Sequence, residues 1–419
     1  MVNDSEAGSS SLEREREAVP EDRSLANTGR QLFVLYVSML VTRAGFGSVL
    51  LLFPLYLAVG SFGVGIALAA YPLMELISAA PVGRYVDLKG RRRVLILGLL
   101  SVSLLTMMLS LTRDFYVVSI IHAIMGFSGA AVTVSSLTMI TDLTAVSNRG
   151  IGMGGFDFAN IMGYALGVTY ATAILHFTGS HYAFAFIATG ILLLSASILS
   201  LMWVSETRHS SAHQKFMVNP LTALDPSTRA ILPLWLGLTS ILGVVFVLPR
   251  SLMETGFRSS QIGFTFALGA FAVGMGSVIF GRMSDKIGRG KTLGIGVVGL
   301  VVLLFTTFDV ITSLPTGISP RLVPVGLGAF IATATVPSAL AYVGDRANRN
   351  LRGSAMGIYS MILSLGLVIG NLLGGYSTSV GGLRAILKAS AGVLTVSLLA
   401  TLLLLYRSGS LRFRQKQSS

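Results

Sequence analysis

Long uncharged runs alternate with short charged segments along this chain. Residues 94–112 lie between Arg93 and Arg113, and residues 158–205 form an uncharged run long enough for two helices. A helix needs about 20 mostly apolar residues to cross a bilayer. The pattern therefore predicts an all-α polytopic membrane protein with twelve transmembrane helices. The predicted spans are residues 33–58, 62–82, 94–112, 116–139, 152–175, 182–204, 230–250, 261–281, 292–313, 322–343, 354–376 and 386–406.

Polar segments divide these spans into two bundles of six. Residues 1–30 contain seven acidic and four basic residues and no apolar core, which predicts a disordered cytoplasmic tail rather than a signal peptide. The predicted N-terminal bundle comprises residues 31–205 and the C-terminal bundle residues 230–407. A cytoplasmic linker at 206–229 joins them, and residues 408–419 form a second cytoplasmic tail.

Composition agrees with a membrane protein and excludes several alternatives. Charged residues make up 12% of the chain, against about 25% in soluble domains, and mean hydropathy is +0.75. With the termini inside, 24 of the 31 Lys and Arg residues fall in the tails and loops of one side. This asymmetry predicts a cell-membrane protein with both termini cytoplasmic. This placement of Lys and Arg also explains the net charge of +13 without nucleic-acid binding. The chain has no cysteine, which excludes disulfides.

An internal repeat is the most informative feature of the sequence. The segment 83–93, GRYVDLKGRRR, recurs as 281–291, GRMSDKIGRGK, with Gly, Asp, Gly and Arg conserved at an offset of 198 residues. Three spaced glycines in span five recur in span eleven at an offset of 203. These glycines are Gly154, Gly163, Gly167, Gly357, Gly366 and Gly370. The chain is therefore predicted to be two equivalent halves in the same orientation.

These motifs resemble the major facilitator superfamily of secondary transporters, and most closely its drug/proton antiporter-like group. The resemblance extends over residues 31–407 and implies two pseudo-symmetric six-helix bundles. It also implies that loop charges close the cytoplasmic side in one state and release it in another; the alternative is that they only cap helices and fix topology. The residues of this predicted switch are Gly83, Asp87, Gly90, Arg91, Asp142, Gly281, Asp285, Gly288, Arg289 and Asp345.

Two departures from the family pattern bear on the expected mechanism. Val168 stands where proline follows the span-five glycines in antiporters, so these glycines either mark antiport or only allow close helix packing. His122 stands in span four where the family usually carries Arg. Imidazole can titrate near neutral pH, so His122 is either a proton carrier or a neutral hydrogen-bonded residue.

Ionisable residues inside the predicted spans are the strongest functional candidates, because charge at membrane depth is costly. Arg43, Glu75 and Asp157 all lie in the N-terminal half. We expect Arg43 to pair with Asp157 or Glu75. Such a pair could couple transport to protons together with His122, or it could be a static ion pair that orders the bundle.

The substrate cavity is expected between the two halves. By resemblance, helices one, four, seven and ten line it, although each polar candidate could instead be a packing residue. The candidates are Arg43, Asn160, Tyr164, Trp235, Thr239, Thr333 and Thr335.

The favoured function is a secondary active, proton-coupled exporter of amphipathic or drug-like compounds that works by alternating access. The alternative is a symporter or facilitator that imports a small metabolite or organic anion, and a non-transporting membrane sensor is a remote third reading. No catalytic or metal-ligand motif points to an enzyme. The expected partners are a small-molecule substrate, protons and the lipid bilayer, with no bound cofactor, metal or nucleic acid, and the chain is expected to be monomeric.

Overall fold

The computed structural model describes residues 6–144, 149–207, 226–313, 322–346 and 352–407, and these contain helices but no strand. Both ends of the chain and most of the predicted linker, residues 208–225, lie outside this described part. The helices are α1 (Glu6–Tyr56), α2 (Ser61–Lys89), α3 (Arg91–Met108), η1 (Leu109–Leu111), α4 (Phe115–Leu143), α5 (Arg149–Phe177), α6 (Tyr182–Trp203), α7 (Pro226–Glu254), α8 (Ser259–Ile287), α9 (Arg289–Ser313), α10 (Leu322–Ala332), α11 (Thr335–Arg346) and α12 (Arg352–Arg407).

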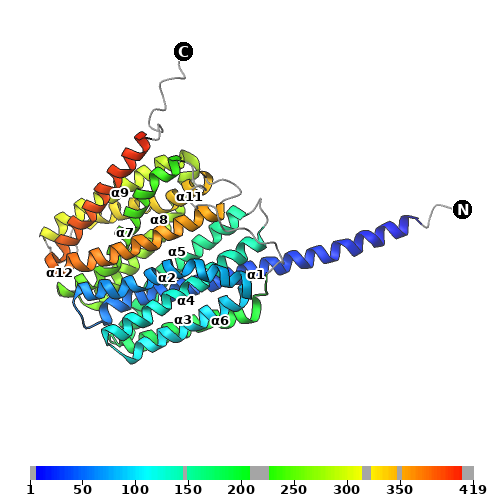
Figure 1. Cartoon of the computed structure of the whole chain (residues 1–419), viewed down its shortest axis with the longest axis horizontal. Helices are drawn as coiled ribbons and strands as arrows, with labels where there is room; N and C mark the ends of the chain where they lie inside the picture. The colour runs from blue at the N-terminus through cyan, green and yellow to red at the C-terminus, as the bar shows by residue number, and fades with distance from the viewer. Residues whose placement is uncertain (1–5, 145–148, 208–225, 314–321, 347–351, 408–419) are drawn as a thin grey trace, which may run out of the picture.

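Ten stretches of the described helices are long and apolar enough to cross a bilayer, which establishes an all-α polytopic membrane protein. The first of these starts at Thr28. Helix α1 itself starts at Glu6, so most of the segment predicted to be disordered is a helical extension that projects away from the bundle (Figure 1). This extension contains five Glu, three Arg and three Ala residues, all of which favour helix.

The helices of the C-terminal half are interrupted at two places, one inside predicted span ten and one between predicted spans eleven and twelve. Spans eleven and twelve lie within α12, where Gly381 and Gly382 interrupt the helical dihedral angles and Gly382 has a φ of 59°. Span ten is divided into α10 and α11 at residues 333–334. Pro337 explains this break, because proline cannot donate to the carbonyl four residues earlier, which belongs to Thr333.

The repeated segments are mostly helical rather than loops. Helix α2 continues to Lys89, and α3 begins after a single turn residue, Gly90, with a φ of 96°. Gly288 forms the equivalent one-residue turn between α8 and α9, with a φ of 101°. Residues with a side chain rarely adopt this left-handed conformation, so both turns favour glycine.

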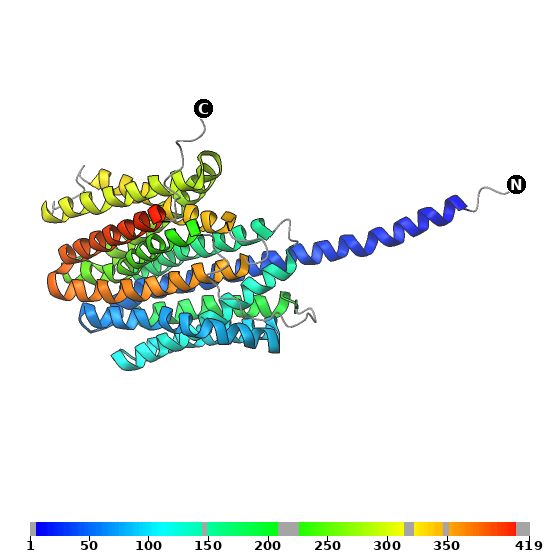
Figure 2. The same cartoon turned by 45° about the horizontal axis from the view of Figure 1, so that its top comes forward.

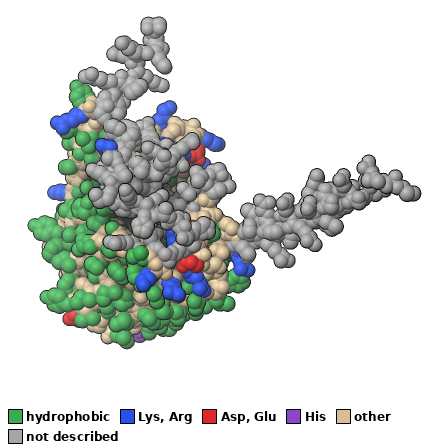
Figure 3. Space-filling view, turned by 45° about the vertical axis from the view of Figure 1, so that its right-hand side comes forward, with side chains coloured by type: hydrophobic (Ala, Val, Ile, Leu, Met, Phe, Trp, Pro, Cys, Tyr) green, Lys and Arg blue, Asp and Glu red, His purple; other side chains and the backbone are tan. Residues whose placement is uncertain are grey.

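The helices run roughly parallel in two neighbouring groups (Figures 1 and 2). We call the end that carries the two repeated segments the signature end, and the other the opposite end. Lys and Arg side chains gather at the end from which α1 projects, whereas the flank beside it is covered with hydrophobic side chains (Figure 3). This separation fits a bundle whose flank faces lipid.

Glycines set the helix crossings on which each half is built. A Cβ on Gly163 would lie 2.6 Å from the Arg43 Cβ, and one on Gly167 would collide with the carbonyl oxygen of Ala44, so α5 packs backbone to backbone on α1. Gly366 and Gly370 meet Thr239 and Ser240 in the same way where α12 crosses α7. Small residues allow such close approach between membrane helices.

Candidate functional site

Arg43 lies in the middle of α1 and is 7% exposed. Its Nε donates to Asn160 Oδ1 at 2.5 Å, its Nη1 to the Tyr164 hydroxyl at 3.3 Å and its Nη2 to Thr133 Oγ1 at 3.0 Å. Each guanidinium nitrogen thus has a neutral oxygen as its partner. Arg43, Asn160 and Tyr164, three of the predicted cavity residues, are therefore brought together by α1 and α5.

Glu75, on α2, is the carboxylate that interacts with this cluster. Its negative charge interacts with the positive charge of Arg43. The described residues form no direct ion pair between Arg43 and Glu75, so their predicted partnership is a charge interaction without contact. The side chain of Asp157, the other predicted partner, lies outside the described residues.

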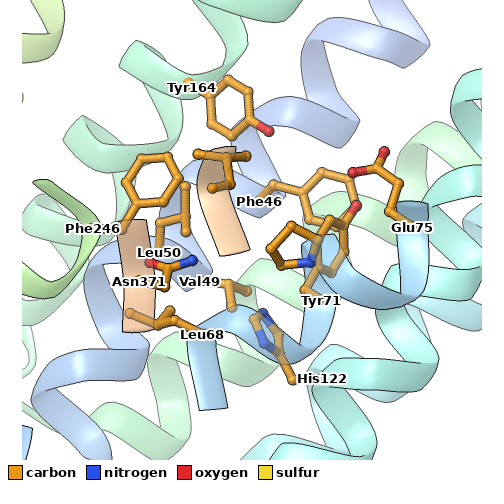
Figure 4. Close-up of a pocket in the computed structure, with 12 residues that line it drawn as sticks. Phe46, Val49, Leu50, Leu68, Tyr71, Glu75, His122, Tyr164, Phe246 and Asn371 are labelled. Atoms are coloured by element: carbon orange, nitrogen blue, oxygen red, sulfur yellow. The ribbon is translucent and has the colours of Figure 1, made fainter. Parts of the chain in front are cut away.

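Glu75 lines a cavity of about 40 Å³ between the two halves, close to Tyr71 (Figure 4). Aromatic rings from α1, α2, α5 and α7 form much of its wall. A space of this size holds about three water molecules. The lining residues are Phe46, Val49, Leu50, Leu68, Tyr71, Pro72, Glu75, His122, Tyr164, Phe246, Leu367 and Asn371.

His122 reaches this cavity from α4 and is 4% exposed. Its Nδ1 lies 2.9 Å from the carbonyl oxygen of Ala67, and its ring stacks on Phe53 with centroids 4.5 Å apart. Because a carbonyl oxygen only accepts, Nδ1 carries a proton. This geometry fits the hydrogen-bonded reading of His122 and leaves its Nε2 as the group that could exchange a proton.

Four predicted cavity residues lie elsewhere, within the C-terminal half. Trp235 is 3% exposed and belongs to that half's apolar core. Thr239 donates to the carbonyl of Trp235 at 3.0 Å and packs on Gly366. Thr333 and Thr335 donate to carbonyls of their own segment at 2.6 Å and 2.8 Å, at the break between α10 and α11. Their hydroxyls satisfy the local backbone, and none of the four lines the central cavity.

The N-terminal half joins two predicted switch residues, Arg91 and Asp142, at the signature end. Arg91 Nε lies 3.3 Å from Asp142 Oδ2, which also accepts a hydrogen bond of 2.9 Å from Thr207. Glu206 accepts from the backbone N–H groups of Arg91 and Arg92 at 2.9 and 3.1 Å. A carboxylate is favourable at the first turn of a helix, so the end of α6 caps α3.

Glu206 and Thr207 were not predicted as site residues. The only sequence signal was their position, since Glu206 is the first charge after the long uncharged run of spans five and six. Their partners lie 65 to 115 residues away, and only the fold brings them together. Gly90 is part of this arrangement, because a Cβ there would lie 2.5 Å from Glu206 Oε2.

The C-terminal signature is more open. Asp285 pairs with Arg289 one turn away, and Arg289 also donates to Ser284 Oγ at 3.2 Å. A Cβ on Gly281 or Gly288 would meet no atom within 4 Å. Other predicted switch and packing positions have side chains or surroundings outside the described residues: Asp87, Asp345, Gly154 and Gly357.

The two halves are joined tightly at the opposite end. Ser61 Oγ lies 2.7 Å from both carboxylate oxygens of Glu254, and Arg250 Nη1 donates to the carbonyl of Leu57 at 3.1 Å. A third contact joins Tyr182 to Ser259 at 2.7 Å. Three hydrogen bonds between described residues therefore join the two halves at the opposite end.

A second cavity, of about 430 Å³, lies between α5 and α8. Every side chain that lines it is apolar. Its lining residues are Phe158, Met162, Phe271, Gly274, Met275, Val278 and Ile279. Amphipathic molecules could contact such a surface without loss of hydrogen bonds.

Two similar helical bundles around a shared central cavity define a polytopic carrier-type membrane protein. The sequence profile of the Major Facilitator Superfamily matches residues 32–250 and again 230–418, so the chain belongs to this family and is a transporter. Multidrug resistance protein 2 of Bacillus subtilis (strain 168) is 25% identical over 83% of this chain and 89% of its own length.

Solved structures of the family have the same fold. The human organic anion transporter MFSD10 has a TM-score of 0.65 at 20% identity and covers 90% of this chain and 99% of its own. The nucleoside transporter NupG has a TM-score of 0.68 at 12% identity, with 90% and 98% covered. The drug-resistance relatives fit the antiporter-like group that the motifs indicated.

Proposed function

We propose that this transporter exports small amphipathic or drug-like compounds in exchange for protons. One observation carries the proposal: among the described residues one carboxylate, Glu75, lines the central cavity, and its charge interacts with that of the buried Arg43. An ionisable residue at this depth is costly and is usually functional. The proposal places both termini in the cytoplasm, as the distribution of Lys and Arg favours.

Protonation of Glu75 would change the balance of charge around Arg43. The ionised carboxylate compensates the guanidinium, whose other partners are the neutral oxygens of Asn160, Tyr164 and Thr133. Once protonated, Glu75 no longer offers this compensation, which alters the relative free energy of the conformations. A substrate and a proton that both require this carboxylate would exclude one another, and that exclusion is the basis of exchange.

The wall chemistry supports an amphipathic substrate. The central cavity has aromatic faces with few polar groups. Sugars need many hydrogen-bonding partners and fit this inventory poorly. The similarity to Multidrug resistance protein 2 supports the same class.

The remaining parts of the proposal concern energy and assembly. The proton gradient supplies the driving force, so no chemical reaction or bound cofactor is required. The contacts at the opposite end and the charge network at the signature end would close in alternation. One chain contains both halves of the cavity, and a monomer in the cell membrane is therefore sufficient.

Flux into proteoliposomes with an imposed pH gradient tests this function. In inside-out orientation, an acidic lumen should drive uptake of compounds from a drug-like panel. The Glu75→Gln variant should lose gradient-driven accumulation but retain counterflow of the same compound. Asp114→Asn is a matched control, because Asp114 caps α4 at 2.9 Å outside the cavity and asparagine also caps well. Gradient-driven accumulation by Glu75→Gln at the wild-type rate would refute the coupling role.

A second candidate is a symporter or facilitator that imports a small metabolite or organic anion. Arg43 beside the cavity favours it, as do the fold neighbours that transport organic anions and nucleosides. The same vesicles discriminate the two, because a symporter accumulates substrate when protons flow in the direction of the substrate.

A further inference from the structure

The cavity between α5 and α8 is a crevice on the flank of the bundle. Five of its seven lining residues are exposed, and Phe271 is the most exposed of them at 61%. Gly274 is buried at its floor. Exposed apolar surfaces of this kind mark sites of contact with a membrane or a partner. In a bundle whose flank faces lipid, the crevice is therefore accessible from the bilayer.

Glycines of α8 show that the crevice is a wedge between the two halves. A Cβ on Gly263 would lie 3.2 Å from the Thr172 Cβ, so α5 and α8 approach closely near the opposite end. Further along α8, a Cβ on Gly274 would meet only the Met162 side chain, with its Cε at 3.4 Å and its Sδ at 3.8 Å. The far end of a long side chain is what spans the gap there. The helices are therefore farther apart at Gly274 than at Gly263.

Two basic residues follow the apolar part of the crevice on α8. Arg282 comes three residues after Ile279, and Lys286 four residues after Arg282, so all three lie on one face of the helix. Arg282 and Lys286 are both exposed. Asp285, the acidic residue beside them, pairs with Arg289. Within the described part of the chain neither Arg282 nor Lys286 forms an ion pair, so their positive charge is available to a ligand.

This order of chemistry along one face matches an anionic amphiphile of the membrane. The apolar crevice measures about 430 Å³, within the range of about 300–1,000 Å³ typical of small-molecule sites. Basic residues next to the apolar surface of membrane helices attract anionic head groups, and a guanidinium binds phosphate well. A cationic amphiphile would be repelled by Arg282. A zwitterionic lipid would gain less from Arg282, because its own cation offsets its phosphate.

We propose that the crevice between α5 and α8 binds one anionic phospholipid. An acyl chain lies against Phe158 and Phe271, and the phosphate lies beside Arg282 and Lys286. The chain contacts both halves, because α5 belongs to the N-terminal half and α8 to the C-terminal half (Figure 1). This inference is independent of the substrate and of the direction of transport, since the lipid enters from the surrounding bilayer.

Photocrosslinking of the full-length protein in vesicles tests this site. The vesicles contain equal amounts of dioleoyl-phosphatidylglycerol and dioleoyl-phosphatidylcholine, which differ only in the head group. Replacement of Phe158 by p-benzoylphenylalanine places a group that reacts with nearby C–H bonds on illumination, and mass spectrometry quantifies the two adducts. The same replacement at Phe305, which is 81% exposed on α9 and does not line the crevice, is the control probe. Phosphatidylglycerol should exceed phosphatidylcholine about fivefold or more at position 158 and should be near parity at position 305.

Charge variants test the head-group contact. Arg282→Gln should lower the phosphatidylglycerol preference at position 158 about fivefold, which is the factor expected for one basic residue at the membrane surface. Adding Lys286→Gln to this variant should bring the two adducts to parity. Arg407→Gln is the matched control, because Arg407 is an exposed arginine at the end of α12 and does not follow the crevice.

Gly274→Leu tests the apolar contact by filling the crevice, and it should lower the yield of both adducts at position 158. Gly269→Leu on the same helix should not, because Gly269 does not line the crevice and its Cβ would meet nothing within 4 Å. The thermal midpoint of each variant checks folding, and the exposed Arg282→Gln keeps the test decisive if Gly274→Leu does not fold. Equal lipid ratios at positions 158 and 305, a preference that Arg282→Gln leaves unchanged, or crosslinks to a second copy of the chain instead of lipid would overturn the inference.

Discussion

The contacts at the opposite end predict a measurable shift between conformations when Ser61 is changed to alanine. Ser61 is 2% exposed and donates to the Glu254 carboxylate at 2.7 Å across the two halves. One hydroxyl proton gives one charge-assisted hydrogen bond, worth about 1.5–3 kcal/mol. Glu254 is 38% exposed, so we take the lower value. About 1.4 kcal/mol corresponds to a tenfold shift, and Ser61→Ala should therefore favour opening of this end about tenfold.

Distance measurements between spin labels test this directly, since the chain has no cysteine to remove. Labels at Ala58 and Thr255, both exposed, report on the opposite end from the two halves. Ser379→Ala is the control, because the Ser379 hydroxyl is exposed and donates only within its helix, to Tyr376 O at 2.7 Å. An unchanged distance distribution for Ser61→Ala, or an equal change for Ser379→Ala, would refute the reasoning.

Three further substitutions have expected outcomes. Gly167→Ala should lower the free energy of unfolding by an overpacking cost of about 1–3 kcal/mol, because its Cβ meets the α1 backbone. Gly269→Ala, whose Cβ would have nothing within 4 Å, should leave it unchanged. Equal thermal midpoints for the two variants would contradict this. Gly90→Ala should lower the thermal midpoint more than Gly256→Ala, because both glycines have a positive φ but only Gly90 lies against the Glu206 carboxylate. A smaller decrease for Gly90→Ala would contradict the capping of α3 by Glu206. Arg43→Lys should reduce gradient-driven flux at least tenfold, because lysine cannot replace three guanidinium contacts; wild-type flux in vesicles would exclude this role.

The segments that cross the membrane were predictable because the cost of charge in lipid is a local property of sequence. The uncharged run between Arg93 and Arg113 became α3, and the repeat at an offset of 198 residues identified the family. The break at Thr333 was not predicted, although Pro337 carried the signal. The repeated segments were expected as loops, yet they are helical up to a single glycine because nothing before it ends the helix.

The partners of the charged residues were less predictable. Arg43 was expected to pair directly with Asp157 or Glu75; it forms no ion pair with Glu75, the Asp157 side chain lies outside the described residues, and α5 brings the oxygens of Asn160 and Tyr164 to it. Such contacts depend on helix rotation, which the glycine crossing of α1 and α5 fixes. Trp235 and Thr239 were expected in the cavity, but the rotation of α7 packs them within their own half.

The sequence by itself determined the membrane class, the two-fold repeat, the family and the scarcity of intramembrane charge, because hydropathy and spacing are read along one chain. Tertiary structure alone decided which contacts join the two halves, and that Glu206 caps a helix more than a hundred residues away. Whether a buried polar atom has a partner depends on positions in three dimensions. No pattern along the chain specifies it, because only the packing of the helices brings the partners together.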